Sequence, residues 1–179
     1  MSSSLQDPPS PTEPPPIEHH FQVGDWAVHP SHGVGKVERI EEKDLGGTVS
    51  EVYVLEIRGS DLKVIVPKMA ASRVGLRPVM SREEAESLFD VLAAAESAVK
   101  AQPWNRRFRA YSEMLSSGSP TEIAKVLRDM HRLKFDKELS FGERRLLDQA
   151  LSLLKEEMAL ATESSADEVD VRINDIFSP

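Results

Sequence analysis

The sequence predicts an α+β protein of two domains, in which a small antiparallel β-barrel is followed by a compact all-α domain of about five helices. From Phe21 to Pro78, short runs rich in Val, Ile and Tyr alternate with turns of Gly, Pro and Asp, a pattern typical of strands. Beyond Pro78, apolar residues recur about every 3.6 residues and Ser–Glu pairs mark helix starts. We therefore expect a β domain of residues 21–79 and a helical domain of residues 80–179.

The predicted strands of the β domain are short. They cover residues 26–29, 34–41, 51–57 and 62–66, with a further short strand near residues 74–78. Gly residues in the segments 43–47 and 58–61 fit turns, because Gly tolerates positive φ. Five short antiparallel strands favour an SH3-like or Tudor-like barrel, which its own side chains fill.

Capping boxes mark the starts of helices in the second domain. In this motif, a Ser hydroxyl and a Glu carboxylate three residues later satisfy free backbone N–H groups reciprocally. The pairs are Ser81/Glu84, Ser119/Glu122, Ser140/Glu143 and Ser165/Glu168. Together with the apolar periodicity, they predict helices over residues 82–100, 104–117, 120–134, 141–162 and 165–177.

Residues 1–20 differ in composition from both domains. They contain six of the 12 Pro of the chain, together with Ser and Glu, and no Lys or Arg. Such a segment buries too little apolar surface to fold, so we expect a disordered, Pro-rich acidic tail. His19 and His20 at its end are a weak metal signal.

The composition also bears on the cellular setting. The chain has no Cys, which excludes disulfides, thiolate metal sites and Cys catalysis and fits a reducing compartment. It shows no signal-peptide pattern, and no apolar run approaches the roughly 18 residues that span a membrane. We expect a cytoplasmic protein without membrane contact.

Charge is distributed unevenly along the chain. The formal net charge is −8, but residues 1–20 and 162–179 contribute −3 and −4 of it. Residues 100–145 instead carry eleven Lys and Arg against six Asp and Glu. A local positive field of this kind attracts phosphates, weakly and with strong salt dependence.

Enzymatic chemistry lacks a supporting motif. Gly33 and Gly35 are not followed by a third Gly and a helix, so they do not form a dinucleotide-binding loop, and the sequence contains no Walker A motif. His29 and His32 lack a third ligand nearby, and no nucleophile elbow is present. We therefore expect no enzymatic activity, no cofactor and no metal.

The segment 103–111 combines aromatic and basic residues. Trp104, Phe108 and Tyr111 have the spacing of a buried helix stripe, yet a surface Trp beside Arg could act as an apolar wedge in DNA. Two basic rows lie nearby in the sequence and are candidate phosphate contacts. The first row is Arg106, Arg107 and Arg109; the second is Lys125, Arg128 and Arg132, expected opposite the apolar stripe of its helix, with Arg144 and Arg145 beginning the next helix.

From Phe21 to Phe177 the chain resembles the CarD/CdnL family of bacterial transcription regulators. In the β domain the resemblance rests on Phe-Gln-Val-Gly-Asp-Trp-Ala-Val-His-Pro (21–30), on Gly33-Val-Gly35 and on Val-Gly-Leu-Arg (74–77). In the helical domain it rests on Trp-Asn-Arg-Arg-Phe-Arg (104–109), Val-Leu-Arg-Asp (126–129) and Leu-Ser-Phe-Gly-Glu-Arg (139–144).

The resemblance implies a non-enzymatic regulator, expected to be a monomer, that docks on the RNA polymerase β subunit and contacts promoter DNA. The Tudor-like domain would dock on polymerase through Tyr53, Lys63, Ile65 and Pro67. Trp104 would wedge into the minor groove at the upstream edge of the −10 region and stabilise the open complex, with weak and largely sequence-independent DNA binding. The expected DNA contacts are Trp104, Arg106, Arg107, Arg109, Lys125, Arg128, Arg132 and Arg144.

The sequence departs from the family in the polymerase-docking region. Some family members carry basic residues there, whereas this chain has Ile65 on the fourth predicted strand and Glu42-Lys43 at the hairpin. The same barrel also occurs in a transcription-repair coupling factor, but this chain has no helicase motifs. An alternative function is a protein-interaction adaptor whose helical domain does not touch DNA. Exposure of Trp104 favours the regulator, and burial under Phe108 and Tyr111 favours the adaptor.

Overall fold

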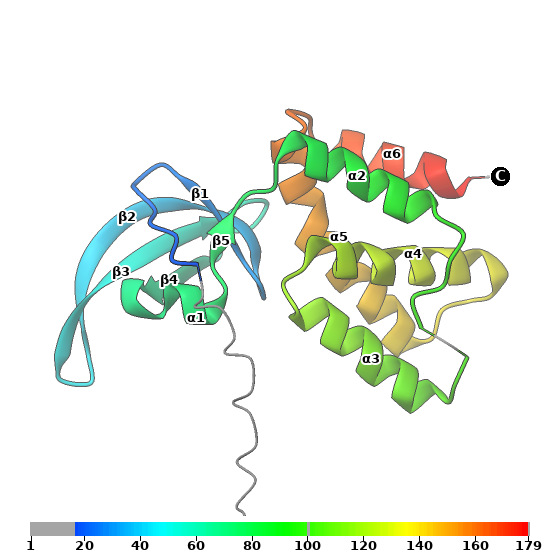
Figure 1. The fold of residues 1–179 in the computed structure, drawn as a ribbon, viewed down its shortest axis with the longest axis horizontal. Helices are drawn as coiled ribbons and strands as arrows, with labels where there is room; N and C mark the ends of the chain where they lie inside the picture. Colours follow the sequence, from blue (N-terminus) through cyan, green and yellow to red (C-terminus); the bar gives the residue numbers. More distant parts are fainter. Residues whose placement is uncertain (1–16, 100, 179) are drawn as a thin grey trace, which may run out of the picture.

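The computed structural model describes residues 17–99 and 101–178 and confirms the predicted α+β architecture. A five-stranded antiparallel sheet precedes a bundle of helices, and Figure 1 shows them as two bodies joined near β5 and the start of α2. Most of the expected disordered tail lies outside the described residues.

The sheet consists of β1 (Trp26–His29), β2 (Gly33–Leu45), β3 (Thr48–Ile57), β4 (Lys63–Pro67) and β5 (Arg77–Pro78). Its strand order is β4-β3-β2-β1-β5, so β4 and β5 are the edges. The curved sheet encloses its own apolar core, in which Val37, Leu55 and Leu76 are among the buried residues.

The β2–β3 hairpin is longer than the sequence predicted. Its strands were expected to end at residue 41 and resume at residue 51, but pairing continues to Leu45 opposite Thr48. Gly46 and Gly47 form the two-residue turn, with φ of 68° and 92°. Positive φ at both positions matches the twist of the strands, so the turn carries the pairing through polar residues that gave no strand signal.

The last predicted strand of the β domain is largely replaced by helical turns. A 3₁₀ turn, η1 (Lys68–Ala70), and a short helix, α1 (Ala71–Val74), precede Gly75, whose φ is 92°. Only Arg77 and Pro78 pair with β1, so the prediction of a strand over residues 74–78 is wrong for its first three residues. Ala71 and Leu76 of this segment are buried in the sheet core.

The helical domain contains α2 (Arg82–Ala93), α3 (Trp104–Ser116), α4 (Pro120–Asp136), α5 (Phe141–Ala161) and α6 (Ala166–Phe177). Complete capping boxes begin α2, α5 and α6 as predicted. The predicted box at the start of α4 forms only in part, since Ser119 accepts a hydrogen bond from the Glu122 amide while the Glu122 carboxylate pairs with Lys125. Leu92, Leu127, Met130, Leu154 and Met158 are among the buried residues that the helices share.

The helix expected over residues 82–100 ends seven residues early, at Ala93. Ala94 has an extended backbone with ψ of 140°, and residues 94–99 cross the bundle without helical structure, while residue 100 lies outside the described part. Ala-rich sequence favours a helix here, so tertiary contacts override the local preference. Among residues 17–99 and 101–178, no helix is long and apolar enough to cross a membrane.

Candidate nucleic-acid interface

Trp104 is the first residue of α3 and lies at the surface of the helical domain. Pro103 precedes it with φ of −54° and ψ of 146°, and no side chain caps the helix start. The Trp104 side chain is partly buried, and its ring centroid is 5.6 Å from that of Phe108. Trp104 therefore shows neither the full exposure nor the full burial that would have decided between the two functions.

Gly142, in the first turn of α5, lies against Trp104. A Cβ at Gly142 would come within 3.0 Å of Trp104 Cζ2 and 3.9 Å of Phe108. The absence of a side chain thus lets the indole rest directly on α5. The Ser140/Glu143 capping box fixes this turn, since each side chain hydrogen-bonds to the backbone N–H of the other residue.

Phe141, immediately before Gly142, is a candidate site residue that the sequence analysis missed. Its side chain is 85% exposed, an unusual state for a large apolar residue. It therefore adds an exposed aromatic ring next in sequence to Gly142, on which Trp104 rests. A sequence signal was available, because Phe141 occupies the first helical position after the cap and falls outside the buried stripe of Leu146, Ala150 and Leu154.

Glu143 links this turn to Lys137. Both Glu143 carboxylate oxygens accept hydrogen bonds from Lys137 Nζ at 2.9 Å. Burial opposes ionisation, but the hydrogen bonds from Lys137 and Ser140 outweigh it and hold the pKa of Glu143 below its usual value. Glu143 therefore remains charged at neutral pH and keeps the α5 start ordered.

The first turns of α3 and α5 also carry exposed Arg residues. Arg106, Arg144 and Arg145 are exposed, and Arg109 is exposed with one contact to Glu113 at 3.4 Å. An ion pair this exposed is weak, so Arg109 remains available to a phosphate. Arg107 lies over the Trp104 ring, 5.1 Å from its centroid, and its Nε donates to Gln102 O at 3.1 Å.

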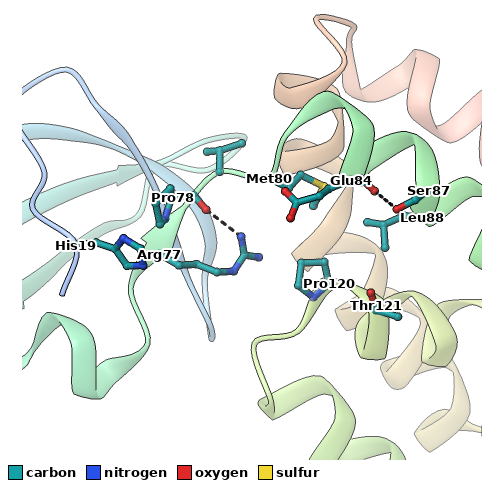
Figure 2. A pocket seen from close by; sticks show the side chains of 10 residues that line it. His19, Arg77, Pro78, Met80, Glu84, Ser87, Leu88, Pro120 and Thr121 are labelled. Atoms are coloured by element: carbon teal, nitrogen blue, oxygen red, sulfur yellow. Dashed lines mark hydrogen bonds between the residues drawn. The ribbon is translucent and has the colours of Figure 1, made fainter. Parts of the chain in front are cut away.

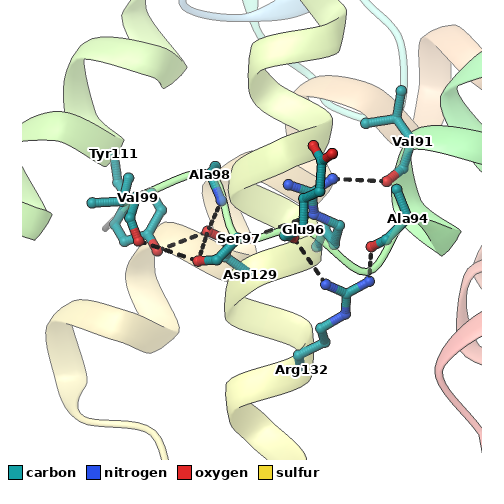
Figure 3. Close-up of polar contacts among 10 residues, drawn as sticks. Val91, Ala94, Glu96, Ser97, Ala98, Val99, Tyr111, Asp129 and Arg132 are labelled. Atoms are coloured by element: carbon teal, nitrogen blue, oxygen red, sulfur yellow. Dashed lines mark hydrogen bonds and ion pairs between the residues drawn. The ribbon is translucent and has the colours of Figure 1, made fainter. Parts of the chain in front are cut away.

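The basic row of α4 does not form part of this surface. Arg128 is only 3% exposed and donates to Val91 O at 3.1 Å, so the expectation that it faces solvent is wrong. Arg132 donates to the carbonyls of Ala94 and Glu96, as Figure 3 shows. Lys125 pairs with Glu122 at 3.0 Å. Arg128 therefore holds the last turn of α2, and Arg132 holds the chain that follows it.

Asp129 of α4 also bonds to the segment 94–99, as Arg132 does. Its carboxylate accepts hydrogen bonds at 2.9 Å from both the Tyr111 hydroxyl and the Ala98 amide (Figure 3), and a longer one from Arg128. Burial and the nearby Asp129 raise the pKa of Tyr111 well above its usual value, so Tyr111 stays neutral. We call Arg128, Asp129 and Arg132 the α4 clamp.

The acidic helices lie away from the Trp104 surface. Figure 1 shows α2 and α6 at one end of the helical domain and α3 at the other. Exposed carboxylates gather on these two helices, at Glu83, Glu84, Glu86, Asp90, Asp167, Glu168 and Asp175. The negative net charge of the chain therefore does not fall on the surface that carries Arg106, Arg109 and Arg144.

The residues expected to dock on polymerase divide into two groups. Lys63, Ile65 and Pro67 alternate with inward-facing residues on β4, an edge of the sheet, and Ile65 is 43% exposed. Tyr53 is only 2% exposed, and its hydroxyl accepts a hydrogen bond from the Phe21 amide at 3.2 Å. The prediction that Tyr53 belongs to this surface is therefore wrong, because its side chain fills the sheet core.

Within the described residues, no group of three or more His, Asp and Glu side chains could hold a metal ion. The surface built here can bind through aromatic contact and positive charge. Trp104 and Phe108 lie against Gly142 of α5, Arg107 lies over the Trp104 ring, and Phe141 and further exposed Arg residues stand on the same two helices. Flat apolar side chains flanked by Arg suit a nucleic acid, since they combine base contacts with phosphate contacts.

Comparison with known proteins gives matches over both domains. The model for the CarD-like/TRCF RID domain matches residues 21–80, and the model for the CarD C-terminal domain matches residues 87–174. The Bacillus subtilis (strain 168) protein "Putative transcription factor YdeB" is 31% identical over 138 residues, which are 77% of this chain and 90% of that protein. This chain therefore belongs to the CarD family of transcription regulators.

Proposed function

We propose that this regulator docks on the RNA polymerase β subunit and stabilises the promoter open complex by inserting Trp104 at the upstream edge of the −10 region. The observation that carries the proposal is Trp104 itself. It rests on Gly142 of α5, remains partly exposed, and has the Arg107 guanidinium over its ring. The regulator is non-enzymatic in this proposal and acts only through binding.

The two halves of the molecule have different tasks in the proposal. The outer face of β4, with Lys63, Ile65 and Pro67, docks on polymerase, because an edge strand with an exposed apolar residue can be covered by a partner. Arg106, Arg109 and Arg144 contact phosphates, and Arg145 adds to them. Phosphate contacts carry no sequence information, so polymerase supplies the location on DNA.

Replacing Trp104 by Ala tests the proposal. We expect the fold to be retained, since Tyr111 and Leu115 fill the core of α3, and the lifetime of the open complex to fall about tenfold. That factor corresponds to about 1.4 kcal/mol, within the ~1–3 kcal/mol of one aromatic–base contact. The measurement is the decay of competitor-resistant complexes formed by purified polymerase with the full chain.

Phe135→Ala is the matched control, because Phe135 is an exposed aromatic in the last turn of α4 whose ring lies beside His131, with centroids 5.7 Å apart. It should leave the lifetime unchanged. A folded Trp104→Ala protein with a normal open-complex lifetime would refute the wedge. The aromatic surface of Trp104, Phe108 and Phe141 would then favour the second candidate, an adaptor that binds a protein partner through this patch.

A further inference from the structure

The β domain and α5 are joined by an ion pair whose carboxylate is buried and whose guanidinium is partly exposed. Arg77 of β5 donates two hydrogen bonds to Glu157, at 2.6 and 2.9 Å, and the Met80 amide donates a third at 3.0 Å. Glu157 is only 1% exposed. Figure 2 shows the Arg77 side chain reaching from the sheet toward the helical domain. An ion pair whose buried carboxylate has all of these hydrogen bonds fixes geometry more than it adds stability.

A second Arg–Glu pair connects the domains beside the first. Arg58, which follows β3, donates from Nε to Glu156 of α5 at 2.9 Å, and its guanidinium lies 5.6 Å from the Trp26 ring centroid. Gly59 makes room for this carboxylate, since a Cβ there would come within 2.7 Å of Glu156 Oε1. Consecutive residues of a helix point about 100° apart, so the two Glu hold two different parts of the β domain.

The β1–β2 turn makes the third contact. Pro30 lies close to Gly118, in the turn between α3 and α4, where a Cβ would be 3.6 Å from it. Gly33 lies against the backbone of Ser152 in α5. Contacts at three separate places prevent rotation about any one of them. We call Arg58–Glu156, Arg77–Glu157 and the Pro30 contact the domain joint.

We propose that the domain joint is a positioning device, which holds Trp104 at a fixed place relative to the edge strand β4. This inference rests on the proposed function and adds to it how the two binding surfaces are coupled. If the two domains could move relative to each other, docking of β4 on polymerase would leave the position of Trp104 relative to the DNA undefined. A fixed joint defines that position, so binding at one surface raises the effective concentration of the other.

The test uses the full chain with two substitutions on α5, Glu156→Arg and Glu157→Gln. They remove both carboxylate partners of the β domain without leaving a buried carboxylate unpaired. We expect unchanged affinity for the isolated β subunit, because β4 is not touched, and an open-complex lifetime shortened about tenfold. Adding Arg58→Glu re-forms one pair with exchanged charges and should recover part of the lifetime.

The domain arrangement is measured directly in the same proteins. The chain has no Cys, so Cys introduced at the exposed positions Glu42 and Asp175 gives one defined pair of spin labels. We expect a narrow distance distribution in the wild type and a broad one in the joint variant. Glu86→Arg is the control, since it breaks the exposed pair of Glu86 with Arg172 inside the helical domain. It should leave both readouts unchanged.

Three outcomes would overturn the inference. They are a distance distribution that stays narrow in the joint variant, a broad distribution with a normal open-complex lifetime, and loss of β-subunit binding, which would place Glu156 and Glu157 in the polymerase contact. Failure of the proposed function would give a different set of results. The wild type would then neither bind the β subunit nor prolong the open complex, whatever the spin labels report.

Discussion

Gly142 controls the position of Trp104 through the side chain that it lacks. The indole contacts the backbone of α5 at this residue, and Phe108 lies against the same place. The Ser140/Glu143 capping box around Gly142 could be predicted from the sequence. The contact of Gly142 with Trp104 could not, since 37 residues separate the two. Only the packing of α3 on α5 reveals why a Gly stands here.

Replacing Gly142 by Ala should displace Trp104 without unfolding the domain. The new Cβ would stand 3.0 Å from Trp104 Cζ2, so the indole must move outward, while Ala favours the helix by up to about 1 kcal/mol. We expect a red-shifted Trp104 emission, measured in a Trp26→Phe background so that Trp104 is the only Trp. Gln149→Ala, exposed on the same helix, is the control, and an unchanged emission for Gly142→Ala would contradict the contact.

Arg128 illustrates a limit of reasoning from charge pattern. Its spacing from Lys125 and Arg132 predicted an exposed basic row, yet Arg128 is buried and bonded to Val91 O. A helix pattern gives the angular position of a residue but not what else covers that side. Here the end of α2 meets Arg128 through Val91 O, and the segment 94–99 crosses α4 because the predicted helix over residues 82–100 stops at Ala93.

At the scale of elements, most features set by residues close in sequence could be predicted, whereas features set by contacts between distant residues could not. The capping boxes at Ser81, Ser140 and Ser165 were predictable because all of their contacts lie within four residues. The end of α2 was not, because its carbonyls and those of the following segment bond to Arg128 and Arg132 of α4. Such a contact exists only after α2 and α4 pack together.

Asp129→Ala should destabilise the helical domain by about 2 to 4 kcal/mol. It leaves the Tyr111 hydroxyl and the Ala98 amide without an acceptor and removes the carboxylate beside Arg128. Urea unfolding followed by circular dichroism measures the loss. Asp90→Ala, which removes an exposed carboxylate from α2, should change stability by less than about 0.5 kcal/mol. Equal stabilities for the two variants would show that the α4 clamp does not hold the segment.

At the scale of the whole molecule, charge is separated between the two ends of the helical domain. The formal net charge of −8 argues against nucleic acid, but α2 and α6 carry many of the exposed carboxylates at the end away from α3. The sequence showed the basic excess of residues 100–145 without showing which cations reach solvent. The structure shows that fewer of these cations face solvent unpaired. Arg128 is buried, Arg132 is hydrogen-bonded to Glu96 O, and Lys137 is paired with Glu143.

The salt dependence of DNA binding should report how many cations of the protein contact phosphates. Four exposed Arg lie on α3 and the start of α5, at positions 106, 109, 144 and 145. Each phosphate contact contributes about −0.9 to the slope of log K against log salt concentration, so the full set predicts a slope of about −3 to −4. Doubling the salt concentration should then weaken binding about tenfold, measured by fluorescence anisotropy of a labelled promoter duplex.

Single substitutions separate this surface from the rest of the chain. Arg144→Ala should make the slope shallower by about one, because it removes one phosphate contact. Arg82→Ala removes another exposed cation, from α2 at the opposite end of the domain, and should leave the slope unchanged. Arg128→Met should also leave it unchanged, since Arg128 is buried. If Arg82 or Arg128 altered the slope as much as Arg144, DNA would not bind at the α3–α5 surface.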